Sequence, residues 1–168
     1  MRSHFAISFS ISLFFGSSLF AQPATGNTPD ALVRSGDEQI ELGQYYMALE
    51  QYEKAYKEVK DKDIAVKIAR THYLLRDYNK STVVFNRALA RDKANKYIEE
   101  RYLFGKALKM NEQYTEAAEE FKKYIELGTD DVLKKKAAVE LAGIELRANM
   151  KEDLGIEVKN AGNNINTP

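Results

Sequence analysis

The sequence predicts an all-α protein built from repeated helical hairpins. Helix-forming Ala, Leu, Glu and Lys are common among its 168 residues, and only 3 residues are Pro. Apolar side chains recur at helical spacing, and one pattern of them occurs in three copies. Each copy has an aromatic residue, a small residue, a second aromatic residue and a further packing residue on one face of a helix.

The three copies are separated by similar lengths of chain. Tyr45 lies 33 residues before Tyr78, which lies 36 residues before Tyr114. A period of roughly 34 residues, made of two helices and a short turn, is typical of a helical solenoid. One hairpin cannot bury its apolar face alone, so neighbouring hairpins are expected to stack. The copies are Tyr45, Ala48, Tyr52 and Ala55; Tyr78, Ser81, Phe85 and Ala88; and Tyr114, Ala117, Phe121 and Tyr124.

Residues 1–21 are predicted to be a secretory signal. Arg2 precedes the apolar run Phe5–Phe15, small residues follow, and Ala21 is a suitable cleavage position. The alternative is an uncleaved membrane anchor. The serine-interrupted run is short against the roughly 20 apolar residues of a spanning helix, which favours cleavage. Residues 22–28 are expected to be a polar linker.

Local signals set the expected helices. Thr28, Pro29 and Asp30 supply a capping hydroxyl, a proline at the first helical position and an acid in the first turn. Gly128 is expected to close the sixth helix and Thr129 to cap the seventh. The expected helices span residues 29–42, 45–60, 64–75, 78–91, 96–110, 114–127 and 130–149.

The repeat register resembles that of the tetratricopeptide repeat (TPR) family over residues 29–149. Gly36, Ala69 and Gly105 match its small position on the first helix of each repeat. Tyr124 departs from its last small position, and Lys60 and Lys93 stand where the family often has Pro. The resemblance implies a solenoid with repeats of about 29–61, 62–95 and 96–128, followed by a capping helix over 129–149. Extra residues before the third repeat lengthen either its loop or its first helix.

The seventh helix is expected to cover the last hairpin and to present a charged outer face. Residues 150–168 follow as a tail, in which Ile156–Lys159 alternates apolar and charged residues as an edge strand does. The tail resembles the start of a β-propeller module, and its alternative is a segment without fixed structure. The charged residues expected on the outer face are Lys134, Lys135, Lys136, Glu140, Glu145 and Arg147.

Signal, repeats and tail together resemble the amino-terminal part of TPR–propeller–OmpA-like envelope proteins, including those associated with type IX secretion. The resemblance implies an exported protein in the periplasm or at the periplasmic face of the outer membrane. The peptidoglycan-binding OmpA-like domain of that group is absent from the 168 residues. Membrane association is therefore expected only through partners or through an uncleaved amino terminus.

The residue types predict neither an enzyme nor a metal or cofactor site. The sequence has no Cys and two His, of which His4 lies in the signal. His72 is expected to be packed and hydrogen-bonded, because no second His or Cys completes a metal set. The adjacent acids Glu99 and Glu100 are interpreted as a cap or a solvated face. Lys and Arg match Asp and Glu at 25 each, which gives no argument for nucleic-acid binding.

The remaining candidate is a groove for a protein or peptide partner. In the TPR family the first helices of successive repeats line a concave groove, and the register places ten residues of this chain there. Members of the family that clamp a carboxy-terminal carboxylate need Lys and Asn at particular groove positions. Here those positions hold Val33 and Asp37 in the first repeat and Val66 and Arg70 in the second. Binding of a carboxy-terminal carboxylate in that way is therefore excluded. The ten are Val33, Asp37, Ile40, Val66, Arg70, Tyr73, Leu74, Tyr102, Lys106 and Lys109.

These observations predict an exported TPR scaffold for protein–protein interaction in the cell envelope, within a secretion-associated or outer-membrane complex. Apolar and aromatic residues interleaved with Arg and Lys suit an extended or helical segment of a partner. The alternative is a periplasmic chaperone-like module that binds unfolded clients loosely.

Overall fold

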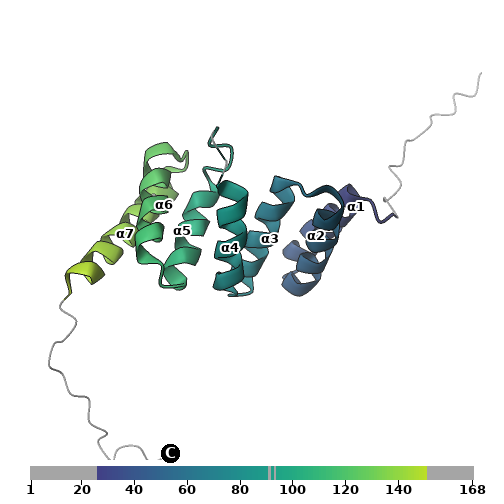
Figure 1. Ribbon diagram of the computed structural model, residues 1–168, viewed down its shortest axis with the longest axis horizontal. Coiled ribbons are helices and arrows are strands. Elements are labelled where there is room, and N and C mark those ends of the chain that lie inside the picture. Colours follow the sequence, from purple (N-terminus) through teal and green to yellow (C-terminus); the bar gives the residue numbers. More distant parts are fainter. Residues whose placement is uncertain (1–25, 91, 93, 151–168) are drawn as a thin grey trace, which may run out of the picture.

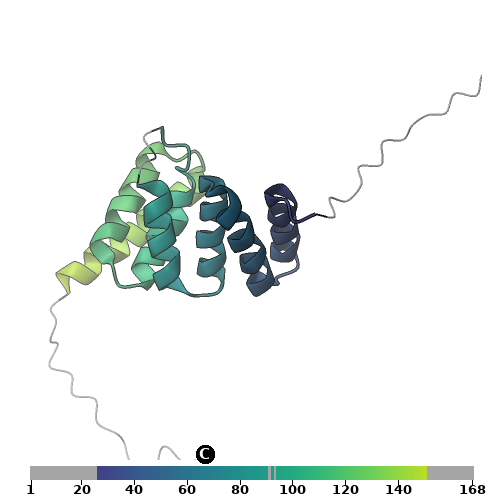
Figure 2. The ribbon, with the colours of Figure 1, turned by 45° about the vertical axis from the view of Figure 1, so that its right-hand side comes forward.

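The computed structural model describes residues 26–90, 92 and 94–150, which form seven helices and no strand. Consecutive helices lie side by side in one row, so the described chain is a stack of hairpins (Figures 1 and 2). The predicted all-α TPR fold is confirmed. The helices are α1 (Pro29–Glu41), α2 (Tyr45–Val59), α3 (Lys62–Leu74), α4 (Tyr78–Leu89), α5 (Glu100–Met110), α6 (Tyr114–Leu127) and α7 (Asp131–Asn149).

The expected signal, Lys93 and the expected strand in the tail lie outside the described residues. Within the described part, none of the helices combines the length and the apolar character needed to cross a membrane.

Small residues let the two helices of each hairpin approach closely. A Cβ at Gly105 would lie 2.8 Å from the ring of Phe121, and a Cβ at Gly36 would overlap the ring of Tyr52. In the middle hairpin the Ser81 hydroxyl donates a hydrogen bond of 2.9 Å to the carbonyl oxygen of Ala69. The small positions in the repeat register are therefore contact points between paired helices.

The buried side chains form two clusters that meet at the second hairpin. The smaller cluster joins α2 and α3, with Tyr52 2% exposed at its centre. The larger one runs from α3 to Ile144 in α7. Tyr56 and Val84 pack against both clusters, so the core is continuous along the solenoid.

The side-chain caps follow the sequence signals with one exception. The Thr28 hydroxyl accepts from the Ala31 amide, and Asp61 accepts from the Asp63 and Ile64 amides. At α7 the cap is Asp130, whose carboxylate accepts from the Val132 and Leu133 amides at 2.8 and 3.0 Å. The prediction of Thr129 as the cap is wrong, because its amide and hydroxyl both donate to Glu99.

The extra residues before the third repeat lengthen its loop. The fifth helix begins at Glu100 and not at Lys96. The Asp92 carboxylate accepts from the amides of Lys96 and Tyr97 at 2.9 and 3.0 Å. These bonds hold the chain in successive tight turns and delay the start of the helix.

Gly128 does not end α6 in the left-handed conformation expected of a capping glycine. Its φ is −63°, in extended backbone. A Cβ there would lie 2.8 Å from the Tyr124 ring and 2.7 Å from the Tyr124 carbonyl oxygen. Glycine is therefore needed at this position for space and not for a positive φ.

The predicted charged outer face of α7 is only partly present. Lys135, Lys136, Glu145 and Arg147 are exposed, and Lys134 is half-buried. Glu140 instead accepts a hydrogen bond from Lys109 of α5, and the Arg147 guanidinium lies 4.5 Å from the centre of the Tyr114 ring. Both side chains therefore help attach α7 to the third hairpin.

Candidate partner-binding surface

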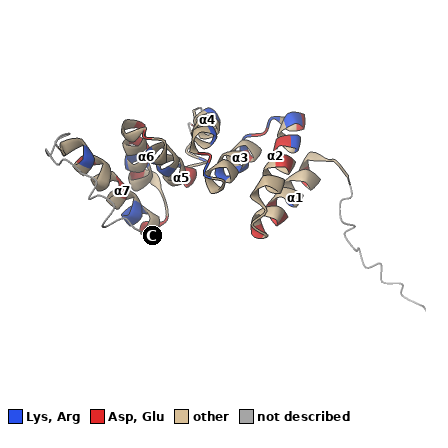
Figure 3. Ribbon diagram, turned by 90° about the horizontal axis from the view of Figure 1, so that it is seen from below, with Lys and Arg blue, Asp and Glu red and all other residues tan. Residues whose placement is uncertain are grey.

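Helices α1, α3, α5 and α7 meet on one side of the solenoid, which we call the inner face. Side-chain pairs cross from each of these helices to the next one and skip the helix between. Asp37 pairs with Lys67, Arg70 with Glu100, and Lys109 with Glu140. Acidic and basic residues are accordingly interspersed along the helices (Figure 3). Most charges predicted for the groove are therefore used within the protein.

Asp37 is the anchor of the inner face between α1 and α3. Its Oδ1 accepts from the Tyr52 hydroxyl and from the Lys67 ammonium, both at 2.6 Å. Burial opposes ionisation of Asp37, but the hydrogen bonds from Lys67 and Tyr52 outweigh it and lower the pKa of the carboxyl. Burial, together with the bond to Asp37, raises the pKa of Tyr52. Asp37 is thus an anion bound to the core of its own repeat.

Arg70 and Glu100 make a looser contact between α3 and α5. The closest nitrogen–oxygen distance is 3.5 Å, and the Arg70 side chain is 57% exposed. Burial raises the pKa of Glu100, and the Arg70 guanidinium only partly offsets this effect. Arg70 therefore retains hydrogen-bonding capacity toward solvent or a ligand.

Lys106 occupies a different environment from the paired cations. Its ammonium lies 5.9 Å from the ring centres of both Tyr73 on α3 and Tyr102 on α5. Among the described residues it forms no ion pair with a carboxylate. Burial alone would lower the pKa of Lys106, but the Tyr73 hydroxyl, with further contributions from Tyr102 and the Glu140 carboxylate, outweighs it, so the pKa is raised and the group is charged at neutral pH.

The rings beside Lys106 are fixed by packing. Tyr102 lies 5.7 Å from the Tyr124 ring and 6.0 Å from the Phe121 ring, and Tyr73 lies 5.5 Å from Tyr78 in an edge-on contact. Both tyrosines remain partly exposed. Lys106, Tyr73 and Tyr102 thus form a preformed cation–aromatic site, which we call the Lys106 site.

The structure does not bring all ten predicted groove residues to the surface. Val66 is 5% exposed and packs in the larger core cluster, so it is not available to a partner. Val33 and Ile40 pack partly against the smaller cluster. Leu74 is 42% exposed near the end of α3. The residues that share the inner face and retain exposed surface near one another are Arg70, Tyr73, Leu74, Tyr102, Lys106 and Lys109.

Sequence reasoning missed the acids that pair with these cations. Glu100 and Glu140 complete inner-face pairs, and the earlier interpretation of Glu100 as a cap or solvated residue is wrong. Glu99 accepts from the Tyr124 hydroxyl at 2.7 Å and from Thr129, so it ties the start of α5 to the end of α6. The pairing of Glu140 with Lys109 could have been inferred from the sequence, because the two residues are 31 positions apart, close to one repeat length.

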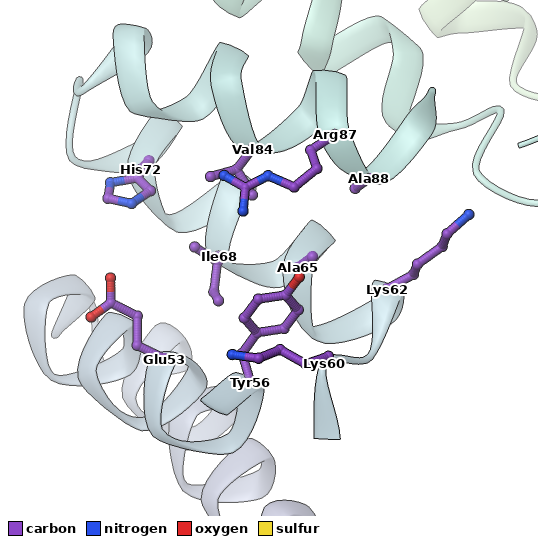
Figure 4. A pocket seen from close by; sticks show the side chains of 10 residues that line it. All are labelled: Glu53, Tyr56, Lys60, Lys62, Ala65, Ile68, His72, Val84, Arg87 and Ala88. Atoms are coloured by element: carbon purple, nitrogen blue, oxygen red, sulfur yellow. The ribbon is translucent and has the colours of Figure 1, made fainter. Parts of the chain in front are cut away.

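A second hollow lies on the opposite side of α3, between α2 and α4 (Figure 4). It holds about 340 Å³ and has an apolar floor that includes Ile68 and Val84. Figure 4 shows Arg87 on one wall, Tyr56 and Lys60 on the other, and Glu53 with His72 at one end. The register of the first helices could not indicate this hollow, because most of its rim comes from second helices and the α2–α3 turn.

His72 is packed, as predicted, but not fully hydrogen-bonded. It is 5% exposed, and its Nδ1 has no hydrogen-bond partner among the described residues. The nearest carboxylate oxygen, of Asp77, lies 3.8 Å away. Burial lowers the pKa of His72, and Asp77 partly offsets this, so the ring is neutral at pH 7. No group of three or more potential metal ligands occurs in the described part of the chain.

Comparisons with known proteins agree with this geometry. The family model described as "Tetratricopeptide repeat" matches residues 29–58, which cover α1 and α2. No curated protein sequence matches the chain. The Sgt2 TPR domain from Aspergillus fumigatus superposes with a TM-score of 0.64 at 21% identity, covering 80% of this chain and 90% of that one.

Two further similar structures contain bound peptides. The first TPR domain of Spaghetti (RPAP3), bound to the HSP90 peptide SRMEEVD, has a TM-score of 0.64 at 18% identity and covers 73% of this chain and 94% of that one. The second is the Yersinia enterocolitica type III secretion chaperone SycD in complex with a peptide of the translocator YopD. It has a TM-score of 0.64 at 14% identity and covers 74% of this chain and 98% of that one. Residues 26–150 of this chain therefore have the TPR fold.

Proposed function

We propose that this chain is an exported protein-interaction module that binds a segment of a partner protein at the Lys106 site. The supporting observation is a charged ammonium held between Tyr73 and Tyr102 without a carboxylate partner among the described residues. Tyrosines in well-packed positions are enriched among the residues that carry most of the binding energy at interfaces. The similar RPAP3 and SycD structures contain peptides, which supports a peptide ligand as the class.

The surroundings of the Lys106 site define the segment that fits. Lys106 and the exposed Arg70 favour a carboxylate, and Tyr73, Tyr102 and Leu74 favour an apolar side chain beside it. The ligand is then an extended or helical segment with an acidic residue next to an apolar one. Asp37 on α1 and Glu140 on α7 would both repel such a carboxylate, so the acidic residue of the segment binds between α3 and α5.

We place this activity in the cell envelope, as part of an outer-membrane or secretion-associated complex. The support is the secretory signal predicted over residues 1–21. Fractionation of cells with mass spectrometry of the mature amino terminus tests it. A chain that starts at Met1 in the cytoplasm would contradict the placement.

Site-specific photo-crosslinking tests the binding proposal. A benzophenone amino acid at position 102 keeps an aromatic ring in the site, and the same residue at Val83, which is 54% exposed on α4, is the control. We expect one dominant crosslinked partner from position 102, absent from position 83 and lost when Lys106→Gln is added. Equal yields from both positions would contradict the proposal.

The chaperone-like alternative gives a different pattern in the same experiment. A module that binds unfolded clients loosely would crosslink many proteins weakly and would show little dependence on Lys106.

A further inference from the structure

Helix α7 has two apolar faces, and only one of them is covered. Ala137 and Ile144 are buried against the third hairpin. On the other side Val132, Val139 and Leu146 are 61%, 73% and 66% exposed. Four of the twelve large hydrophobic side chains that are exposed among the described residues, these three and Met150, belong to α7 or its carboxy-terminal cap.

The exposed apolar residues of α7 form a regular stripe. Val132, Val139 and Leu146 are seven residues apart, and Lys135 and Ala142 stand three residues after the first two. All five are exposed. Alternating steps of three and four residues over two heptads are the spacing by which two helices pack along a common seam. We call these five residues the α7 stripe.

The described residues contain nothing that covers the α7 stripe. In each complete hairpin the first helix packs against a second helix that carries an aromatic residue, such as Phe121 against Gly105. The sequence after α7, residues 151–168, contains no aromatic residue.

The charges beside the stripe favour a second copy of the same helix. Lys135 lies in the first half of α7 and Glu145 in the second half. If two α7 helices pack antiparallel, Lys135 of one copy lies beside Glu145 of the other, and Ala142 lies beside Val139 in the middle. A parallel arrangement would place Lys135 against Lys135. Two-fold symmetry forms each contact twice.

We infer that α7 is a self-association surface, through which two copies of this chain pack antiparallel along the α7 stripe. The contact does not use Lys106 or Tyr73, but its residues Lys135 and Val139 line one hollow with Tyr102 of the Lys106 site. It places two Lys106 sites in one assembly, so a partner with two acidic segments would gain avidity. Self-association does not require the proposed ligand and is tested without it.

Sedimentation equilibrium of residues 22–168 tests the inference, because the continuous core of the structure lies within residues 26–150. We expect the average mass to rise from one to two chains with increasing concentration. Val139→Asp is expected to weaken the dimer at least about tenfold. The matched control Val83→Asp changes a side chain that is 54% exposed on α4 and should leave the dimer intact. Circular dichroism checks folding, and Val139→Gln is a milder second variant.

Charge exchange tests the antiparallel orientation. Lys135→Glu alone and Glu145→Lys alone each bring like charges together twice and should weaken the dimer. A mixture of the two variants forms two Glu–Lys contacts and should restore it. A single-chain mass at every concentration, or a dimer unaffected by both Val139 variants, would overturn the inference. A dimer weakened at Val139 but not restored in the mixture would overturn the antiparallel arrangement.

Discussion

The two halves of the inner face use their cations in different ways. Between α1 and α3, Lys67 is bound to Asp37, which also accepts from the core residue Tyr52. Between α3 and α5, Lys106 lies among the rings of Tyr73 and Tyr102 and has no carboxylate partner in the described chain. The same fold therefore presents paired charges at one end of the inner face and, toward the other end, one cation without a carboxylate partner among the described residues.

This difference is the basis on which we propose the binding site. A cation already paired at 2.6 Å attracts a ligand carboxylate less strongly than an unpaired one, because its charge is partly neutralised. A cation held over aromatic rings loses little when a carboxylate arrives. The repeats share the helical-hairpin fold but differ in how the charges on their inner faces are paired.

The largest expected effect tests whether the hairpins are equivalent in packing. Gly105→Val should lower the free energy of unfolding by about 2–3 kcal/mol, because the added side chain meets the Phe121 ring. Chemical denaturation measures it. Gly143→Val is the control, since a Cβ there would meet only the Lys109 ammonium, at 3.9 Å. An equal loss at both glycines would refute the close-approach explanation.

Loss of the free cation is expected to affect binding more than stability. Lys106→Gln should weaken partner binding at least about tenfold, or roughly 1.4 kcal/mol, and should change stability by less than about 0.5 kcal/mol. Calorimetric titration with the crosslinked segment, made as a peptide, measures the affinity. Lys54→Gln on the outer helix α2 is the control. Unchanged affinity would remove Lys106 from the binding surface.

A substitution in the half of the inner face between α1 and α3, where Asp37 pairs with Lys67, should affect stability more than binding. Asp37→Asn should cost about 1 kcal/mol of stability, because it weakens two hydrogen bonds at a carboxylate side chain that is 45% exposed. Partner affinity should stay constant or rise slightly, since an anion is removed from the inner face. Weaker binding in Asp37→Asn would show that the first half also contacts the partner.

The smallest expected effect concerns pH. His72 has a pKa below its ordinary 6.5 in the folded protein, because it is buried; Asp77 and Glu53 raise it only partly, and Lys80 lowers it further. As the pH falls, His72 therefore takes up a proton in the unfolded chain at a higher pH than in the folded protein. Acidification then favours the unfolded chain and lowers the free energy of unfolding. His72→Gln should remove that part of the decline between pH 7 and pH 5. If the free energy of unfolding of His72→Gln falls between pH 7 and pH 5 as much as that of the unsubstituted chain, His72 is not the titrating group.

The fold was predictable because its packing pattern is local. Tyr45, Ala48, Tyr52 and Ala55 lie within three turns of one helix, and the same spacing returns in the next two hairpins. The start of α5 was not predictable from periodicity, because the Asp92 carboxylate binds two backbone amides that a helix would otherwise use. Helix boundaries here depend on side-chain caps and not on apolar spacing.

The candidate site was only partly predictable. The repeat register correctly brought Tyr73, Tyr102 and Lys106 together, since all three occupy the inner face of consecutive first helices. It could not show that Asp37 is paired, because Lys67 lies 30 residues away in another repeat. It also placed Val66 in the groove, although that side chain turns into the core. Pairing and burial depend on the angle between hairpins, which the register does not contain.

Crosslinking from the two halves of the inner face tests whether partner binding is confined to the Lys106 site. Chains that carry the same benzophenone residue at position 33 on α1 or at position 102 on α5 would be compared for the yield of one crosslinked partner. The account predicts a strong product from position 102 and little or none from position 33. Equal yields, or a higher yield from position 33, would contradict it.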